Sequence, residues 1–240
     1  MDLKPRHITE LLMAANTNEL NALAAKALDF ISEGAVVGLG TGRAATVFLH
    51  VLGEKVRAGF PIRGVPTSLE SERLACELGI PLTSLDEVDS IDVDVDGADE
   101  ADPAGNLIKG YGGALLREKI VAAASRRVVI LVGEEKLVPV LGSRGVLPVE
   151  VIPFGKGACA RQLTSLGLNP RPRMREGQLM LTDNGNHILD CDTPTISQPE
   201  QLEAAIRAIP GVVGTGLFLG MNPTVLIGSS AGVIVRGPVG

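Results

Sequence analysis

Apolar and polar residues alternate over the first 141 residues in the order that βαβ units produce. A helical pattern from about residue 8 to residue 31 leads into AVVGLGTG, a short apolar strand followed by a glycine turn. The run RRVVILVG is continuously apolar, which is typical of a strand covered on both faces. We therefore predict a mostly parallel, doubly wound sheet. Its other expected helices span 44–56, 68–78 and 114–124, and its other expected strands span 62–66, 82–85 and 91–96.

The pattern changes near residue 142. LPVEVIPFG, with its prolines, is typical of an edge-like strand, and a helix is expected over 159–166. QLMLTDNGNHILDCD predicts two strands joined by an Asn/Gly turn, before a helix over 199–208 and a strand in VVGTGLFLG. This β-α-β-β-α-β order predicts a small ferredoxin-like α+β unit. The final strand-rich segment, TVLIGSSAGVIVRG, is expected to rejoin the first sheet.

Composition narrows the class of protein. The chain has 240 residues, of which 45% are hydrophobic but only 2% aromatic, so its core must be aliphatic. A net charge of -6 argues against non-specific nucleic-acid binding, which needs a basic face. The three cysteines are widely spaced and form no CxxC pair, which indicates neither a disulfide framework nor a zinc site and favours a cytoplasmic location. We expect no membrane span, because no apolar run reaches about 20 residues.

Carboxylates at the end of one predicted strand are the first candidates for chemistry. Asp96 and Asp99 follow the alternating strand, and open α/β sheets bind ligands beyond the C-terminal ends of their strands. Asp92 and Asp94 share one face of that strand, where we expect them to be solvated or ion-paired. The D-x-D-x-D-G pattern imitates a calcium loop, but its twelfth position falls on Pro103, which cannot ligate. Spacing alone leaves a magnesium site on Asp96 and Asp99 open.

Charged residues that follow this strand add a base and two cations. Lys109 precedes the glycine-rich loop 110–113, a placement that favours a cation directed at an oxyanion or a phosphate. Lys136 follows the next strand and suits the same role. Glu118 lies on a helix with apolar residues three positions before and four positions after it. Partial burial there should raise the pKa of Glu118 towards the range of a general base.

The segment GLGTGRAATVF forms a glycine loop between a predicted strand and a predicted helix. Gly40, Gly42 and Ala45 fit the dinucleotide fingerprint loosely. That function also requires an acidic residue after the second strand, where residues 66–68 are Pro-Thr-Ser. We therefore favour a cradle for a monophosphate, with Arg43 supplying charge, over a nicotinamide site or a plain tight turn.

Together these segments resemble the type A ribose-5-phosphate isomerase family. The resemblance includes VVGLGTG, GVPTSLESERLA, DVDGADEADPAGNLIKG, GALLREKIVAAAS and TDNGNHILD. It implies an aldose-ketose isomerase of the non-oxidative pentose phosphate pathway that uses no metal or organic cofactor. It also implies a Rossmann-like domain, assigned to 1–141 plus 217–240, and a smaller ferredoxin-like domain over 142–216. A homodimer or homotetramer is expected.

By this resemblance Glu118 is the proton acceptor and Lys109 stabilises the enediolate, while Asp96 and Asp99 contact the sugar hydroxyls and help to open the ring. The loop 40–44 is GTGRA, where the family commonly has GTGST, so Arg43 is a candidate to bind phosphate in place of two lost hydroxyls. The expected substrate-binding residues are Thr41, Gly42, Arg43, Ala44, Gly97, Ala98, Gly110, Tyr111, Gly112 and Lys136.

Two other functions are compatible with the same patterns. One is a sugar-phosphate-sensing module that binds its ligand without turnover. The other is a CoA-transferase-like enzyme in which a glutamate acts as nucleophile. The acidic chain has no room for an added DNA-binding unit, and the presence of Glu118, Lys109 and both aspartates favours catalysis.

Overall fold

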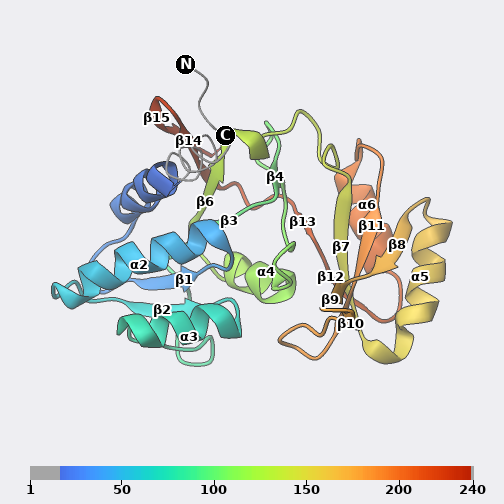
Figure 1. Ribbon diagram of the computed structural model, residues 1–240, viewed down its shortest axis with the longest axis horizontal. Helices are drawn as coiled ribbons and strands as arrows, with labels where there is room; N and C mark the ends of the chain where they lie inside the picture. The colour runs from blue at the N-terminus through green and yellow to red at the C-terminus, as the bar shows by residue number, and fades with distance from the viewer. Residues whose placement is uncertain (1–16, 239–240) are drawn as a thin grey trace, which may run out of the picture.

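A six-stranded sheet forms the larger half of the computed structural model, which describes residues 17–238. Its strand order is β15-β14-β6-β3-β1-β2, and every neighbouring pair is parallel except β14 with β15. The predicted doubly wound sheet is therefore confirmed, as is the return of the C-terminal segment to it (Figure 1). The strands are β1 (Val36–Leu39), β2 (Arg63–Pro66), β3 (Val93–Gly97), β6 (Val128–Gly133), β14 (Thr224–Ser229) and β15 (Gly232–Arg236).

Different elements cover the two faces of this sheet. Residues 17–27, α2 (Arg43–Arg57) and α3 (Leu69–Leu78) share one apolar core with it. On the other face, α4 (Leu115–Ala123) packs beside a small sheet of β4 (Glu100–Ala101), β5 (Leu107–Ile108) and β13 (Leu217–Phe218). The predicted helix over 8–31 is helical at 17–27 and ends in the 3-10 turn η1 (Leu28–Phe30). Its first residues lie outside the described part of the chain.

A four-stranded antiparallel sheet forms the second half, with its own core. Its order is β12-β7-β11-β8, which in chain order is 4-1-3-2, as the split βαβ prediction requires. The predicted fold class is thus confirmed, while the domain boundaries at 141/142 and 216/217 stay a prediction. The elements are β7 (Val146–Val151), α5 (Lys156–Ser165), β8 (Asn169–Pro172), β11 (His187–Asp192), α6 (Pro199–Arg207) and β12 (Val212–Thr215), with η2 (Glu134–Lys136), η3 (Pro153–Gly155) and the ribbon of β9 (Met174–Arg175) and β10 (Gln178–Leu179).

Three local predictions are wrong, two of them because of proline. β7 is a central strand, not an edge: the Pro148 carbonyl accepts a bond from the Gly216 amide, so the missing N–H faces the point where β12 ends. The strand after α5 is β8, which holds two prolines at an edge, whereas 178–182 contributes only the short β10. Residues 82–85 form a single bridge through Leu82 instead of a strand.

Candidate active site

Asp96 is held at the end of β3 by a close approach between β3 and the loop after β1. Its Oδ1 accepts bonds from the backbone N–H groups of Thr41 (3.1 Å) and Gly97 (2.7 Å). A Cβ atom on Gly40 would lie 2.3 Å from that oxygen and 2.6 Å from the Asp96 Cα. Glycine at position 40 is therefore required for the carboxylate to reach the loop.

The substitution Gly40→Ala is expected to destabilise the fold by about 1–3 kcal/mol or more, because its neighbour is backbone that cannot move aside. Urea unfolding would measure the loss. Gly237→Ala is the matched control, since a Cβ there meets no atom within 4 Å. Equal unfolding midpoints for the two variants would contradict the packing argument.

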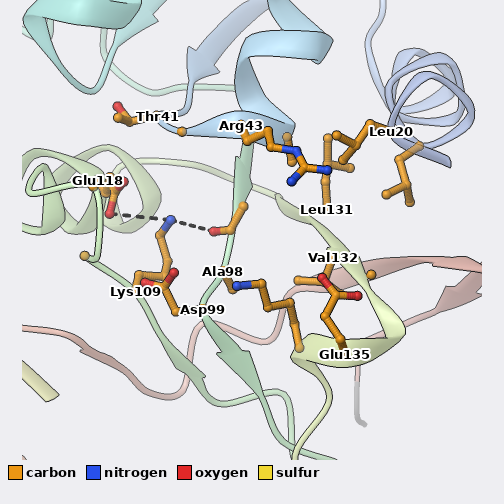
Figure 2. A pocket seen from close by; sticks show the side chains of 18 of the residues that line it. Leu20, Thr41, Arg43, Ala98, Asp99, Lys109, Glu118, Leu131, Val132 and Glu135 are labelled. Carbon is orange, nitrogen blue, oxygen red and sulfur yellow. Dashed lines mark hydrogen bonds and ion pairs between the residues drawn. The ribbon is translucent and has the colours of Figure 1, made fainter. Parts of the chain in front are cut away.

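Lys109 is the centre of a buried charge cluster. Its Nζ lies 3.5 Å from Glu118 Oε2 (Figure 2). The same nitrogen lies 2.9 Å from Asp96 Oδ2 and donates to the Gly97 carbonyl at 2.6 Å. The Phe218 ring centroid is 5.4 Å from the same nitrogen. Burial disfavours the charged amine, but the carboxylates of Asp96 and Glu118 outweigh it and raise the pKa of Lys109. The site therefore keeps a fixed positive charge.

Glu118 reaches this cluster from α4, on the buried side of the helix that also carries Leu115 and Ala122. Its side chain is 5% exposed, and this burial raises the pKa of Glu118 to about 8. The Lys109 charge lowers that pKa, whereas the negative charges of Asp96 and Asp99 raise it further. A carboxylate with a pKa in this range can both accept and return a proton near neutral pH.

The other aspartates of the strand and loop differ in their surroundings. Burial raises the pKa of Asp99, against the effect of the Tyr111 N–H that donates to its Oδ2 at 3.0 Å. Asp92 is ion-paired with Arg126 at 3.4 Å, as predicted. The same prediction is wrong for Asp94, which is 1% exposed with no hydrogen-bond partner for Oδ1. α4 covers this face of the sheet, and the resulting burial raises the pKa of Asp94 well above its usual range. The negative charge of Asp96 raises the pKa of Asp94 further.

A cavity of about 370 Å³ opens where β1, β3 and β6 end. Lys109, Glu118 and Asp99 line its inner end, and Arg43 and Glu135 lie farther along it (Figure 2). Of the residues predicted from sequence, those that line the cavity are Thr41, Gly42, Arg43, Ala44, Gly97, Ala98, Asp99, Lys109, Gly110, Gly112, Glu118 and Lys136. The structure thus brings them together, while their roles stay a proposal.

Two predicted site residues do not line the cavity. Asp96 is fully buried beside Lys109. The Tyr111 hydroxyl donates to the carbonyl of Val146, in β7 of the four-stranded sheet, at 3.2 Å. Sequence reasoning also missed residues that belong to the site. Thr67 and Ser68 hold the Thr41 hydroxyl at 2.7 and 2.8 Å. They directly follow a strand, and that signal could have identified them.

The N-terminal helix also contributes lining that the sequence did not reveal. Leu20 and Leu23 border the cavity, together with Glu19 and the η2 residue Glu135 (Figure 2). Leucines at helical spacing are indistinguishable from core residues in a sequence, so no signal separated them.

A metal does not suit the position beside Asp96. Among residues 17–238 no group of three or more His, Cys, Asp or Glu side chains is arranged to hold a metal ion. Both oxygens of Asp96 already have partners, since Oδ2 pairs with the Lys109 ammonium at 2.9 Å and Oδ1 accepts bonds from the Thr41 and Gly97 N–H groups. The magnesium site left open by spacing is thus not supported.

Within residues 17–238, none of the helices combines the length and the apolar character that a membrane span needs.

The sequence of this chain is similar to those of one family of known proteins. The family model for ribose 5-phosphate isomerase A (phosphoriboisomerase A) matches residues 63–232. Ribose-5-phosphate isomerase A of Gloeobacter violaceus is 50% identical over 217 residues, covering 90% of this chain and 94% of that protein. The protein of the same name from Parvibaculum lavamentivorans is 46% identical over 222 residues, covering 90% and 96%. The chain belongs to the ribose 5-phosphate isomerase A family.

Solved structures agree with this family membership. Ribose 5-phosphate isomerase A from Methanocaldococcus jannaschii superimposes with a TM-score of 0.88 at 38% identity, over 92% of this chain and 99% of that one. A D-ribose-5-phosphate isomerase in complex with phospho-erythronic acid gives 0.88 at 41% identity, over 92% and 98%. As a member of the ribose 5-phosphate isomerase A family, the chain is an isomerase. This favours catalysis over the sensing and CoA-transferase alternatives.

Proposed function

We propose that this chain interconverts D-ribose 5-phosphate and D-ribulose 5-phosphate in the non-oxidative pentose phosphate pathway, with Glu118 as its single acid–base group. The observation that carries this proposal is the buried pair of Glu118 and Lys109 at the inner end of the cavity. It supplies a base of raised pKa beside a permanent positive charge. This combination is suited to removing a proton next to a carbonyl, because the base accepts the proton and the cation stabilises the negative charge that develops on oxygen.

The proposed reaction begins with the open-chain aldose bound in the cavity. Glu118 removes the C2 proton, the C1 carbonyl oxygen takes up the electron pair, and a cis-enediolate forms. Lys109 stabilises its negative charge, and Asp99 contacts the sugar hydroxyls. Protonated Glu118 then delivers its proton to C1 while the O2 hydroxyl proton passes to O1, so the ketose forms without net oxidation. Asp96 acts by holding Lys109 at 2.9 Å.

The phosphate is proposed to bind at the outer part of the cavity. Helix α2 begins at Arg43 after Gly42, and its first residues line the cavity, so the positive end of its dipole lies beside this space. The side chains of Arg43 and Lys136 border the same space and supply two cations. With the phosphate bound there, we expect the reacting carbons to lie towards Glu118.

The value of kcat/KM is expected to rise with pH and level off above an apparent pKa near 8, because only ionised Glu118 can accept the C2 proton. A raised pKa keeps the carboxyl protonated at pH values where ordinary glutamates are ionised, so activity falls as pH drops through that pKa. Initial rates from about pH 5 to about pH 9.5 would test this. A profile already flat from about pH 5 upward would show that Glu118 titrates like an exposed glutamate.

The function itself is tested by proton NMR of EDTA-treated protein with D-ribose 5-phosphate in D2O. We expect D-ribulose 5-phosphate to appear, with deuterium incorporated at the reacting carbon. Binding without conversion or exchange would favour the sensing module. Trapping of a glutamyl adduct with hydroxylamine in the presence of acyl-CoA would favour the CoA-transferase alternative.

The domain division and the oligomeric state of the chain are also proposed. We infer a catalytic domain of 1–141 plus 217–240 and a small domain of 142–216, because each half is built on its own sheet. The core under the four-stranded sheet also takes in Ile108, Val138, Leu141 and Leu217 from the catalytic part, so the two domains pack together. A homodimer or homotetramer in solution is expected from the family resemblance. Sedimentation equilibrium would distinguish these from a monomer.

A further inference from the structure

The glycine-rich loop 110–113 is hydrogen-bonded to the half of the molecule that carries the four-stranded sheet. This loop joins Lys109 to the helix that carries Glu118. The Arg173 Nη1 donates to the Gly110 carbonyl at 2.7 Å and to the Tyr111 carbonyl at 3.1 Å. A single guanidinium, from the residue between β8 and β9, therefore holds two successive carbonyls of the loop.

Arg173 is itself held rigidly. Its Nε donates to Asp190 Oδ2 at 2.9 Å, and its Nη2 contacts the other oxygen of the same carboxylate. The two side chains are only 12% and 23% exposed. The Arg173 backbone N–H donates a hydrogen bond to the Ile188 carbonyl (2.9 Å), and the Arg173 carbonyl accepts one from the Met180 N–H (3.0 Å). A bidentate pair on a fixed backbone presents its remaining N–H groups in one direction, which a lysine could not do.

The loop fixed in this way is linked to two of the charged groups of the cavity, by the chain to Lys109 and by a hydrogen bond to Asp99. Lys109 directly precedes Gly110, whose φ of +109° is a conformation that glycine adopts freely. The Tyr111 N–H donates to Asp99 Oδ2 at 3.0 Å. Because glycines give the loop little stiffness of its own, its hydrogen-bonding partners help to fix the backbone that follows Lys109 and the Tyr111 N–H that holds the Asp99 carboxylate.

We propose that Arg173 is a positioning residue for the isomerisation, and that it holds loop 110–113 so that Lys109 and Asp99 face the substrate. Arg173 does not line the cavity and acts only through these two residues. The small domain thereby takes part in catalysis without contacting substrate. This inference rests on the proposed function, since its effect is measured in turnover.

The chain supplies a matched control two residues away. Arg171 pairs with Asp192 at 2.5 Å across the same two strands, but on the exposed surface and away from the loop. Arg173→Met is expected to lower kcat by about 10- to 100-fold with a smaller change in KM, because small misplacements of catalytic groups have effects of this size. Arg171→Met should leave both constants within about twofold.

Two further measurements separate positioning from general stability. The apparent pKa of the rising limb of kcat/KM should move in Arg173→Met and not in Arg171→Met, because Lys109 and Asp99 both act on the pKa of Glu118. Asp190→Asn should also lower kcat, yet add nothing in the Arg173→Met background, since it acts through Arg173. If Arg173→Met does not fold, Arg173→Lys keeps the charge without the fork and should show a partial loss of kcat.

Equal kcat values for the Arg173 and Arg171 variants, with an active wild type, would overturn this inference and leave the proposed function intact. Additive losses in the Asp190→Asn double variant would also overturn it. A wild-type chain that does not isomerise D-ribose 5-phosphate would overturn the proposed function and this inference together.

Discussion

Glu118→Gln is expected to lower kcat by about 10³- to 10⁴-fold, because glutamine cannot accept the C2 proton at any pH. The amide has nearly the same shape as the carboxyl that Glu118 carries when protonated. Since burial favours that neutral form, the variant should fold with an unfolding midpoint equal to or above that of the wild type. Initial rates and urea unfolding at the same pH would measure the two effects separately.

Glu77→Gln is the control for this substitution. Glu77 is exposed on α3, where it pairs with Arg73 in an i,i+4 bridge, so its amide should leave kcat unchanged. Deuterium exchange into substrate should also disappear in Glu118→Gln, because exchange needs only the first proton transfer. A variant that exchanges deuterium but no longer forms ketose would place the C2 base elsewhere and make Glu118 the C1 acid alone.

The candidate site was largely predictable because its residues follow strand ends. Asp96 at the end of β3, Asp99 just after it and the glycine loop after β1 are local signals, and parallel strands bring such ends to one edge of the sheet. The pairing of Lys109 with Glu118 is different, because it depends on the conformation of the intervening glycine loop. Only the motif resemblance suggested it, and the structure shows the 3.5 Å distance.

Asp94 shows what alternation cannot reveal. The period of two correctly places Asp92, Asp94 and Asp96 on one face of the strand. It does not say where along that face a helix lies. α4 crosses β3 near Asp94, and Asp92 lies at the rim where Arg126 can reach it. The pattern therefore predicted the shared face but not the burial of Asp94.

The small domain was predicted in type but not in its strands. The prolines of LPVEVIPFG led to the prediction of an edge for β7, and no strand was predicted over β8, which is half proline. Whether a proline is tolerated depends on which side its missing N–H faces, and that is set by partners distant in sequence. For the same reason the bonds from Arg173 to Gly110 and Tyr111 were invisible in the sequence.

Lys109→Met is expected to remove most turnover and much of the stability at alkaline pH. Without the ammonium the enediolate loses its stabilising charge, which should lower kcat by about 10²- to 10³-fold. The buried carboxylates of Asp96 and Glu118 also lose their cation, and breaking such a buried pair costs about 3–5 kcal/mol. Urea unfolding of the variant and the wild type would measure this loss.

The sign of the pH dependence separates charge from packing in Lys109→Met. Burial already raises the pKa of Glu118 to about 8 in the wild type, and without the Lys109 charge this pKa should rise further. The folded variant then holds the Glu118 proton to higher pH than the wild type does, so its stability goes on falling above about pH 8, where the wild-type carboxyl is already ionised. The deficit against wild type should be clearly larger at about pH 9.5 than at about pH 6, whereas a loss of packing contacts would cost the same at both. The exposed Lys26, paired with Asp29 at 2.8 Å, provides the control: Lys26→Met should change stability by less than about 1 kcal/mol at either pH.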